Sequence, residues 1–294
     1  ALLSAAVTEV ELVVEVEQPP AKDLSLLERL LQSRLDDHMG LIPGVFVKDL
    51  QTGDELMING DVAYAGLSVL KIAVLEEVYR NLDEPPGPET SRLISDTATE
   101  SDNVSANLLL RDVVDDGDGL QAAEELTASM NRLGLVNTYM AAPYDEKKAA
   151  SEIVTPANSR TDISTDPDPF IQTTPLDIGL LLEMIYQCSR GGGALIMTYP
   201  ESLNAEECQE MLRWMSQNRV DTLIDAGVPP GTRVAHKHGW TSDTHADAGI
   251  AFTPGGHYVL VIFLHRPQWL EWEESAPLIA DISTAAYNYF NPGR

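Results

Sequence analysis

The sequence is short of basic residues and contains no long apolar run. It holds 19 Lys and Arg against 46 Asp and Glu, which gives a formal net charge of -27 at pH 7. Nucleic acids and anionic membrane surfaces are bound through clustered Lys and Arg, so this balance argues against both as partners. A bilayer-spanning helix needs about eighteen or more consecutive apolar residues, and no such run occurs, so we expect no membrane span. A basic segment typical of a signal peptide is also missing, although a chain that starts at Ala1 without Met is compatible with a processed or shortened form.

Cysteine is represented by Cys188 and Cys208 alone. They lie at the end of one expected helix and the start of the next, where helix ends can approach each other. A disulfide between them would suit an oxidising compartment, and two unpaired buried thiols fit the sequence equally well.

The length and the apolar content indicate a globular chain. With 294 residues, of which 44% are hydrophobic, the chain can form one large domain or two interleaved lobes with a sizeable core. The acidic excess is compatible with salt adaptation, but a globular protein kept dispersed by its charge explains it more simply.

Helix and strand signals divide the chain into an interrupted α/β lobe and a helical block. Residues 7–14 alternate like a short strand and end at two prolines, so residues 1–23 are interpreted as a linker or the tail of an upstream segment. Apolar residues then recur at helical spacing over residues 24–39, and a hairpin is expected from residues 44–50 and 55–58. Further helices are expected at residues 68–81, 104–113, 120–133, 175–189, 206–217 and 276–289, and further strands at 233–238, 248–252 and 257–265.

This order predicts an α/β (α+β) fold in which the N- and C-terminal helices flank an antiparallel sheet and an all-α lobe is inserted. Residues 24–60 and 219–294 form the predicted α/β lobe, and residues 61–218 form the predicted all-α lobe. The cleft between the lobes is the expected place for a site.

Three short motifs follow one another in this framework. Ser68-Val69-Leu70-Lys71 opens a helix, Ser101-Asp102-Asn103 precedes another, and Lys237-His238-Gly239 lies on an expected strand. A serine hydroxyl is a poor nucleophile near neutral pH and needs a base, and one helical turn brings Lys71 to the same side as Ser68. Burial in a cleft and the second cation, Lys237, would both lower the pKa of Lys71 toward the range in which it can act as that base. Alone, each motif is compatible with a surface serine, a solvated lysine or a helix cap.

The ordered motifs and their contexts resemble the penicillin-recognising active-site serine hydrolases, most closely class A β-lactamases, over about residues 24–291. The contexts that carry the resemblance are Tyr64-Ala65-Gly66-Leu67 before the serine, Val104-Ser105-Ala106-Asn107-Leu108-Leu109 after the second motif, and Thr174-Pro175 at the start of a helix.

The resemblance implies a β-lactamase/transpeptidase-like fold and a serine hydrolase that acts on amide bonds. It implies Ser68 as the acylated nucleophile, Lys71 as its base, Ser101 as the carrier of a proton to the leaving nitrogen and Lys237 as a source of positive potential. Substrate-binding residues would be Asn103, His238, Gly239 and Trp240, with the backbone N–H groups of Ser68 and Trp240 forming the oxyanion hole. It further implies a small β-lactam or peptidoglycan-like peptide as substrate, no cofactor, a monomer, and a location outside the cell or in its envelope.

Some positions depart from the family pattern. His238 stands where Thr or Ser is usual, and its larger ring can donate to a substrate carboxylate but also crowds it. Arg233 and His245 are the candidates to replace the usual arginine on the following strand. His236, His238 and His245 lie close together in sequence, but without a carboxylate partner evident they are interpreted as scattered polar positions rather than a metal site.

The segment from Tyr144 to Thr174 lacks the Glu-x-x-Leu-Asn motif whose glutamate activates water for deacylation in class A enzymes. Glu146, Glu152, Asp162 and Asp166 are candidates to replace it, and the sequence does not choose between them. Three hypotheses follow: a β-lactamase-like hydrolase, a penicillin-binding D-Ala-D-Ala peptidase or esterase with slow β-lactam deacylation, and a non-catalytic relative that binds a ligand. The intact serine, lysine and Ser101-Asp102-Asn103 residues argue against the third.

Overall fold

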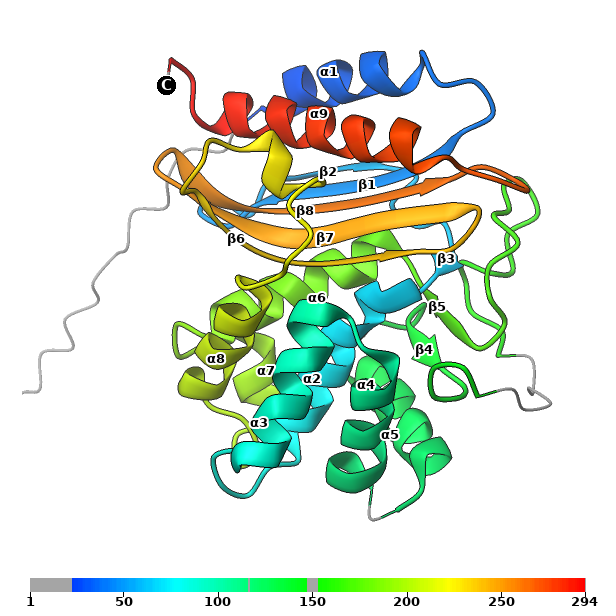
Figure 1. The fold of residues 1–294 in the computed structure, drawn as a ribbon. Helices are drawn as coiled ribbons and strands as arrows, with labels where there is room; N and C mark the ends of the chain where they lie inside the picture. Colours follow the sequence, from blue (N-terminus) through cyan, green and yellow to red (C-terminus); the bar gives the residue numbers. More distant parts are fainter. Residues whose placement is uncertain (1–22, 116, 147–152, 294) are drawn as a thin grey trace, which may run out of the picture.

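The computed structural model of the chain describes residues 23–115, 117–146 and 153–293. The strand predicted at residues 7–14 lies outside them. Within the described residues, a five-stranded antiparallel sheet lies between two terminal helices and a larger group of helices, which confirms the predicted fold class (Figure 1). None of the helices in these ranges is long and apolar enough to cross a membrane.

The sheet has the strand order β2-β1-β8-β7-β6, and every neighbouring pair is antiparallel. Both of its faces are buried, so successive side chains of a strand enter two different cores. In the central strand β8, Val259, Val261 and Phe263 face the helical block, whereas Leu260 and Ile262 face the terminal helices. The strands are β1 (Ile42–Asp49), β2 (Glu55–Ile58), β6 (Arg233–Trp240), β7 (Thr244–Thr253) and β8 (Gly256–His265).

The terminal helices α1 (Ser25–Leu35) and α9 (Trp272–Phe290) cover one face of the sheet side by side (Figure 1). Tyr289 Oη donates to the carbonyl oxygen of Asp23 at 2.8 Å, and Arg34 pairs with Asp281 at 2.7 Å. The two ends of the described chain are therefore neighbours, as the sequence predicted.

The opposite face of the sheet carries the helical block. Helix α6 crosses it directly: Gly179 has no side chain because a Cβ there would lie 2.1 Å from the Phe46 ring of β1. A disulfide between Cys188 and Cys208 joins the end of α6 to α8 and decides between the two alternatives that the sequence left open. The helices of the block are α2 (Lys71–Arg80), α3 (Pro88–Ser95), α4 (Asn103–Leu109), α5 (Gly119–Arg132), α6 (Pro175–Cys188), α7 (Gly193–Thr198) and α8 (Ala205–Met215).

Several predicted boundaries are wrong, for identifiable reasons. Helix α1 ends at Leu35 rather than residue 39, because Asp36, Asp37 and His38 have low helix propensity and Met39 is exposed instead of packing on the sheet. Strand β7 begins at Thr244 rather than residue 248, because the polar residues His245 and Asp247 hide it from a hydrophobic pattern. The helix predicted at residues 104–113 consists of α4 and a π-helical turn, Leu110–Val114. Elements that the sequence did not predict include α3, α7, the π-helical turn Asp96–Glu100, and a small sheet of β3 (Tyr64–Ala65), β5 (Ile171–Thr173) and β4 (Tyr139–Met140).

Candidate active site

Ser68 lies in one turn of 3-10 helix, Leu67–Leu70, which leads directly into α2. Leu67 has a left-handed backbone (φ 51°), so the chain turns sharply just before the serine. Residues 62–71 are otherwise buried, whereas Ser68 stays partly exposed. The Ser68 hydroxyl is therefore accessible to solvent, whereas the residues around it in the chain are packed in the core.

Lys71 is wholly buried, and its side-chain nitrogen bonds to residues of the first two motifs. Nζ donates to Ser68 Oγ at 2.9 Å, to the carbonyl oxygen of Ser101 at 2.7 Å and to Asn103 Oδ1 at 2.5 Å. Burial lowers the pKa of Lys71 from 10.5 to about 8, although nearby carboxylates oppose the shift. A lysine in this state can take the proton of the Ser68 hydroxyl close to neutral pH.

Ser101 connects the two buried lysines. Lys237 Nζ on β6 donates to Ser101 Oγ at 2.9 Å and to the carbonyl oxygen of His238 at 3.0 Å. Burial, and after it the charge of Lys71, lower the pKa of Lys237 well below its ordinary value. Asp102 caps α4 by accepting from the Ser105 N–H at 2.6 Å, so the helix-cap interpretation of this motif is also correct.

Strand β6 passes so close to the serine that only glycine fits at position 239. A Cβ on Gly239 would lie 2.6 Å from the backbone nitrogen of Ser68 and 2.8 Å from Cβ of Leu67. The strand edge therefore borders Ser68, where the resemblance expects an oxyanion hole.

His238 and Trp240 project from the other face of β6, stacked with ring centroids 5.2 Å apart. Nδ1 of His238 accepts from Asn218 Nδ2 at 3.0 Å, which leaves the proton on Nε2. Burial, then the charge of Lys237, lower the pKa of His238 to about 3, so the ring is neutral. His238 can therefore donate one hydrogen bond but supplies no positive charge for a carboxylate.

Asp145, which the sequence did not single out, lies at this site. Its carboxylate accepts from Asn103 Nδ2 at 2.8 Å, and thus completes a chain from Lys71 through Asn103. Helix α4 holds the backbone next to Asp145 in place, because the side-chain amide of Asn107 on α4 forms two hydrogen bonds with the backbone of Tyr144, at 2.7 and 2.9 Å. The ring centroid of Tyr144 lies 4.5 Å from Nζ of Lys71, so this loop forms one wall of the site.

A cavity of about 470 Å³ opens beside Asp145, between this loop, residues 166–171 and the β6–β7 turn. Asp166 and Glu146 line it, so two of the four predicted deacylating acids share a cavity with Asp145, whereas Ser68 is not among its lining residues. Asp162 instead pairs with Arg160 at 2.7 Å, and Glu152 lies outside the described residues.

The two candidates for the missing arginine are wrong. Arg233 lies at the opposite end of β6 and donates to Ser216 Oγ, so it points away from Ser68. His245 is buried and bonds to Ser275 Oγ through Nδ1 and to the Thr241 carbonyl oxygen through Nε2. The third nearby histidine, His236, is also buried and bonds to Asp247, so each of the three histidines has its own partner.

The model of the Beta-lactamase enzyme family matches residues 85–290. The chain belongs to this family. No curated protein sequence matches it. The family match includes the second and third motifs of the site, whereas Ser68 and Lys71 precede the matched residues.

Solved structures of related enzymes share the fold. PBP-A is 22% identical with a TM-score of 0.71, covering 93% of this chain and 98% of its own. A PBP-A variant in an acyl-enzyme complex with penicillin G is also 22% identical, with a TM-score of 0.70 and coverage of 92% and 98%. The β-lactamase from Desulfarculus baarsii is 19% identical, with a TM-score of 0.68 and coverage of 92% and 99%. At these identities the likeness concerns the β-lactamase fold.

Proposed function

We propose that this member of the β-lactamase family is a serine hydrolase that is acylated on Ser68 by β-lactams or related amides. The observation that carries the proposal is the wholly buried Lys71 nitrogen, 2.9 Å from Ser68 Oγ, with a pKa lowered to about 8. A structural lysine would be expected to pair with a carboxylate, whereas Lys71 bonds directly to a hydroxyl, a carbonyl oxygen and an amide oxygen.

In the first step Lys71 Nζ takes the hydroxyl proton while Ser68 Oγ forms a bond to the carbonyl carbon of the substrate. The carbonyl oxygen becomes negative and is held by the backbone N–H groups of Ser68 and Trp240. The carbon–nitrogen bond then breaks, and Ser101 gives its hydroxyl proton to the leaving nitrogen. Lys71, which lies 3.5 Å from Ser101 Oγ, returns the proton to Ser101, so the acyl-enzyme forms with no net proton uptake.

The second step, hydrolysis of the acyl-enzyme, is proposed to be slow with β-lactams. It needs a base beside the ester, and the Glu-x-x-Leu-Asn motif is absent. Asp145 lies near but is exposed to solvent and already bonds to Asn103. Slow release favours a penicillin-binding D-Ala-D-Ala peptidase or esterase as the alternative function, and the fold likeness to PBP-A is compatible with it.

Incubation with a penicillin and a chromogenic cephalosporin, followed by intact-mass measurement, tests the proposal. We expect a covalent adduct that outlives many acylation times, and no adduct on Ser68→Ala. Lys71→Ala should slow acylation by at least about 100-fold, the low end for a positioned general base. The control Lys48→Ala removes a lysine of β1 that pairs with Glu183, and it should not slow acylation. Rapid turnover without adduct would establish an efficient β-lactamase, and an adduct on Ser68→Ala would refute the assignment.

A further inference from the structure

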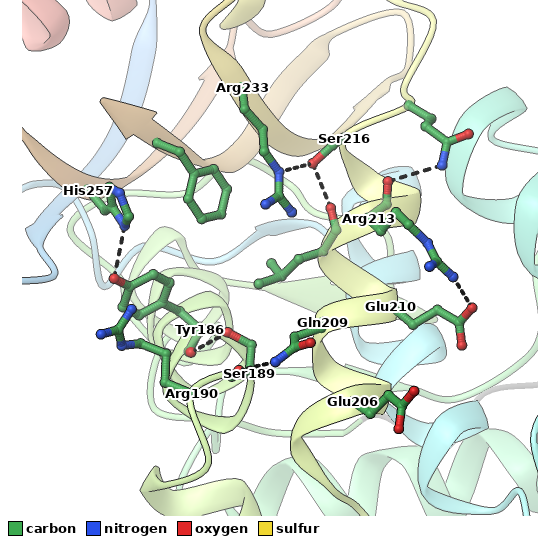
Figure 2. A pocket seen from close by; sticks show the side chains of 13 residues that line it. Tyr186, Ser189, Arg190, Glu206, Gln209, Glu210, Arg213, Ser216, Arg233 and His257 are labelled. Carbon is green, nitrogen blue, oxygen red and sulfur yellow. Dashed lines mark hydrogen bonds and ion pairs between the residues drawn. The ribbon is translucent and has the colours of Figure 1, made fainter. Parts of the chain in front are cut away.

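A cavity of about 770 Å³ lies at the far end of β6 from the reaction site. It is bordered by the end of α6 and one side of α8, and by the sheet opposite them (Figure 2). Its side chains include Tyr186, Arg190, Gln209, Ser216, Arg233 and His257. The proposed hydrolysis uses none of these residues.

Arg233 is held in a fixed orientation in this cavity. Its Nε donates to Ser216 Oγ at 3.0 Å, and the guanidinium carbon lies 4.3 Å from the ring centroid of Phe252. Stacking and the Nε bond leave the two terminal nitrogens directed into the cavity, as Figure 2 shows. This planar pair of donors matches the two oxygens of a carboxylate or phosphate.

A second arginine faces the same space. The guanidinium of Arg190 lies 5.6 Å from the ring of Tyr186, whose hydroxyl bonds to Nδ1 of His257 at 2.9 Å. Across the three described ranges of the chain, neither Arg190 nor Arg233 forms an ion pair with a carboxylate. Burial lowers the pKa of His257, and the charges of both arginines, which line the same cavity, lower it further.

The carboxylates that line the cavity do not neutralise Arg233. Glu210 is already paired with Arg213. Glu206 is remote from Ser216, the residue to which Arg233 is bonded. The two lie ten residues apart along α8, which is about 15 Å at 1.5 Å per residue. In a chain with 46 acidic and 19 basic residues, two arginines without carboxylate partners therefore line one cavity.

We propose that this cavity is a binding site for a small anionic molecule whose carboxylate or phosphate group is held by Arg233 and Arg190. Arg233 supplies a bidentate contact, and Arg190 supplies a second positive charge beside the Tyr186–His257 pair. The amide of Gln209, which donates to the Ser189 carbonyl oxygen at 2.8 Å, helps to order the lower wall (Figure 2).

Titration with sodium phosphate and with sodium acetate, each against sodium chloride at equal ionic strength, tests this site in the full chain. We expect at least one of the two oxyanions to raise the melting temperature more than chloride does, because a ligand that binds only the folded state stabilises it. The same oxyanion should shift the Nε–H resonance of Arg233. The salt that acts distinguishes a phosphate from a carboxylate ligand.

Arg233→Gln should weaken the apparent affinity at least about tenfold, and Arg190→Gln should also weaken it. The control Arg92→Gln alters an exposed arginine on α3 that pairs with Asp96, and it should bind as the wild type does. If Arg233→Gln does not fold in sodium chloride, the affinity of Arg190→Gln alone decides whether the cavity binds the anion. The proposal is overturned if neither oxyanion exceeds chloride in the wild type, or if the arginine variants at the cavity respond as Arg92→Gln does.

Discussion

The acylation rate should depend on pH through Lys71. With a pKa of about 8 instead of 10.5, about a tenth of the lysine is neutral at pH 7, against about 0.03% for an ordinary lysine. Burial thus raises the fraction of active base by about 300-fold. Because the neutral amine is the proposed base, acylation should rise with pH, by about tenfold per unit below the pKa, and level off above about pH 9.

Asp145→Asn should shift the midpoint of this pH–rate profile to lower pH. The carboxylate of Asp145 raises the pKa of Lys71, so its removal should move the midpoint to lower pH. Asn103 bridges the two groups through contacts of 2.5 and 2.8 Å, which puts the charges about 6–7 Å apart. At effective dielectric constants of about 20–80 the interaction is about 0.6–2.6 kcal/mol, or about 0.5–2 pH units.

Stopped-flow acylation with a fluorescent penicillin between about pH 5.5 and 10 measures both profiles. The control Asp162→Asn removes a carboxylate that pairs with Arg160 rather than with the site, and its midpoint should equal that of the wild type. A flat profile, a rate that falls with pH, or an upward shift in Asp145→Asn would refute Lys71 as the base.

Two further predictions concern packing and covalent structure. Gly239→Ala should slow acylation by about 100-fold, measured with the same fluorescent penicillin, because its Cβ would force β6 away from Ser68. In the control Gly87→Ala the added Cβ meets nothing within 4 Å, and this variant should acylate at the wild-type rate. Equal rates for the two variants would contradict the close approach of β6 to Ser68. Replacing Cys188 and Cys208 by alanine should lower the free energy of unfolding by about 3 kcal/mol, as expected for a disulfide with a sequence separation of 20. Denaturant titration measures this value. An unchanged free energy of unfolding would show that the disulfide does not reduce the conformational entropy of the unfolded chain.

Local patterns were sufficient to predict the elements that carry the motifs. The one-turn separation of Ser68 and Lys71 and the strand around Lys237 depend on helical and strand spacing alone, and the structure brings both motifs to Ser101. The closing helix was also predictable, because the apolar residues of α9 recur at helical spacing along its buried face.

Tertiary contacts determine what the sequence could not show. Asp145 reaches Asn103 only because Asn107, 37 residues before Tyr144, holds the backbone of that loop. The first half of β7 was not predicted, because it contains the buried polar residue Asp247, whose carboxylate hydrogen-bonds to His236 on β6. A hydrophobic pattern does not distinguish such a buried polar pair from the polar residues of a loop.

The most direct test of the central claim is peptide mapping after reaction with a fluorophosphonate or a penicillin. The proposed function predicts a single modified peptide that carries the adduct on Ser68, and an unmodified chain when Ser68→Ala is treated identically. Modification of another serine in the wild type, with an equal yield in Ser68→Ala, would contradict it.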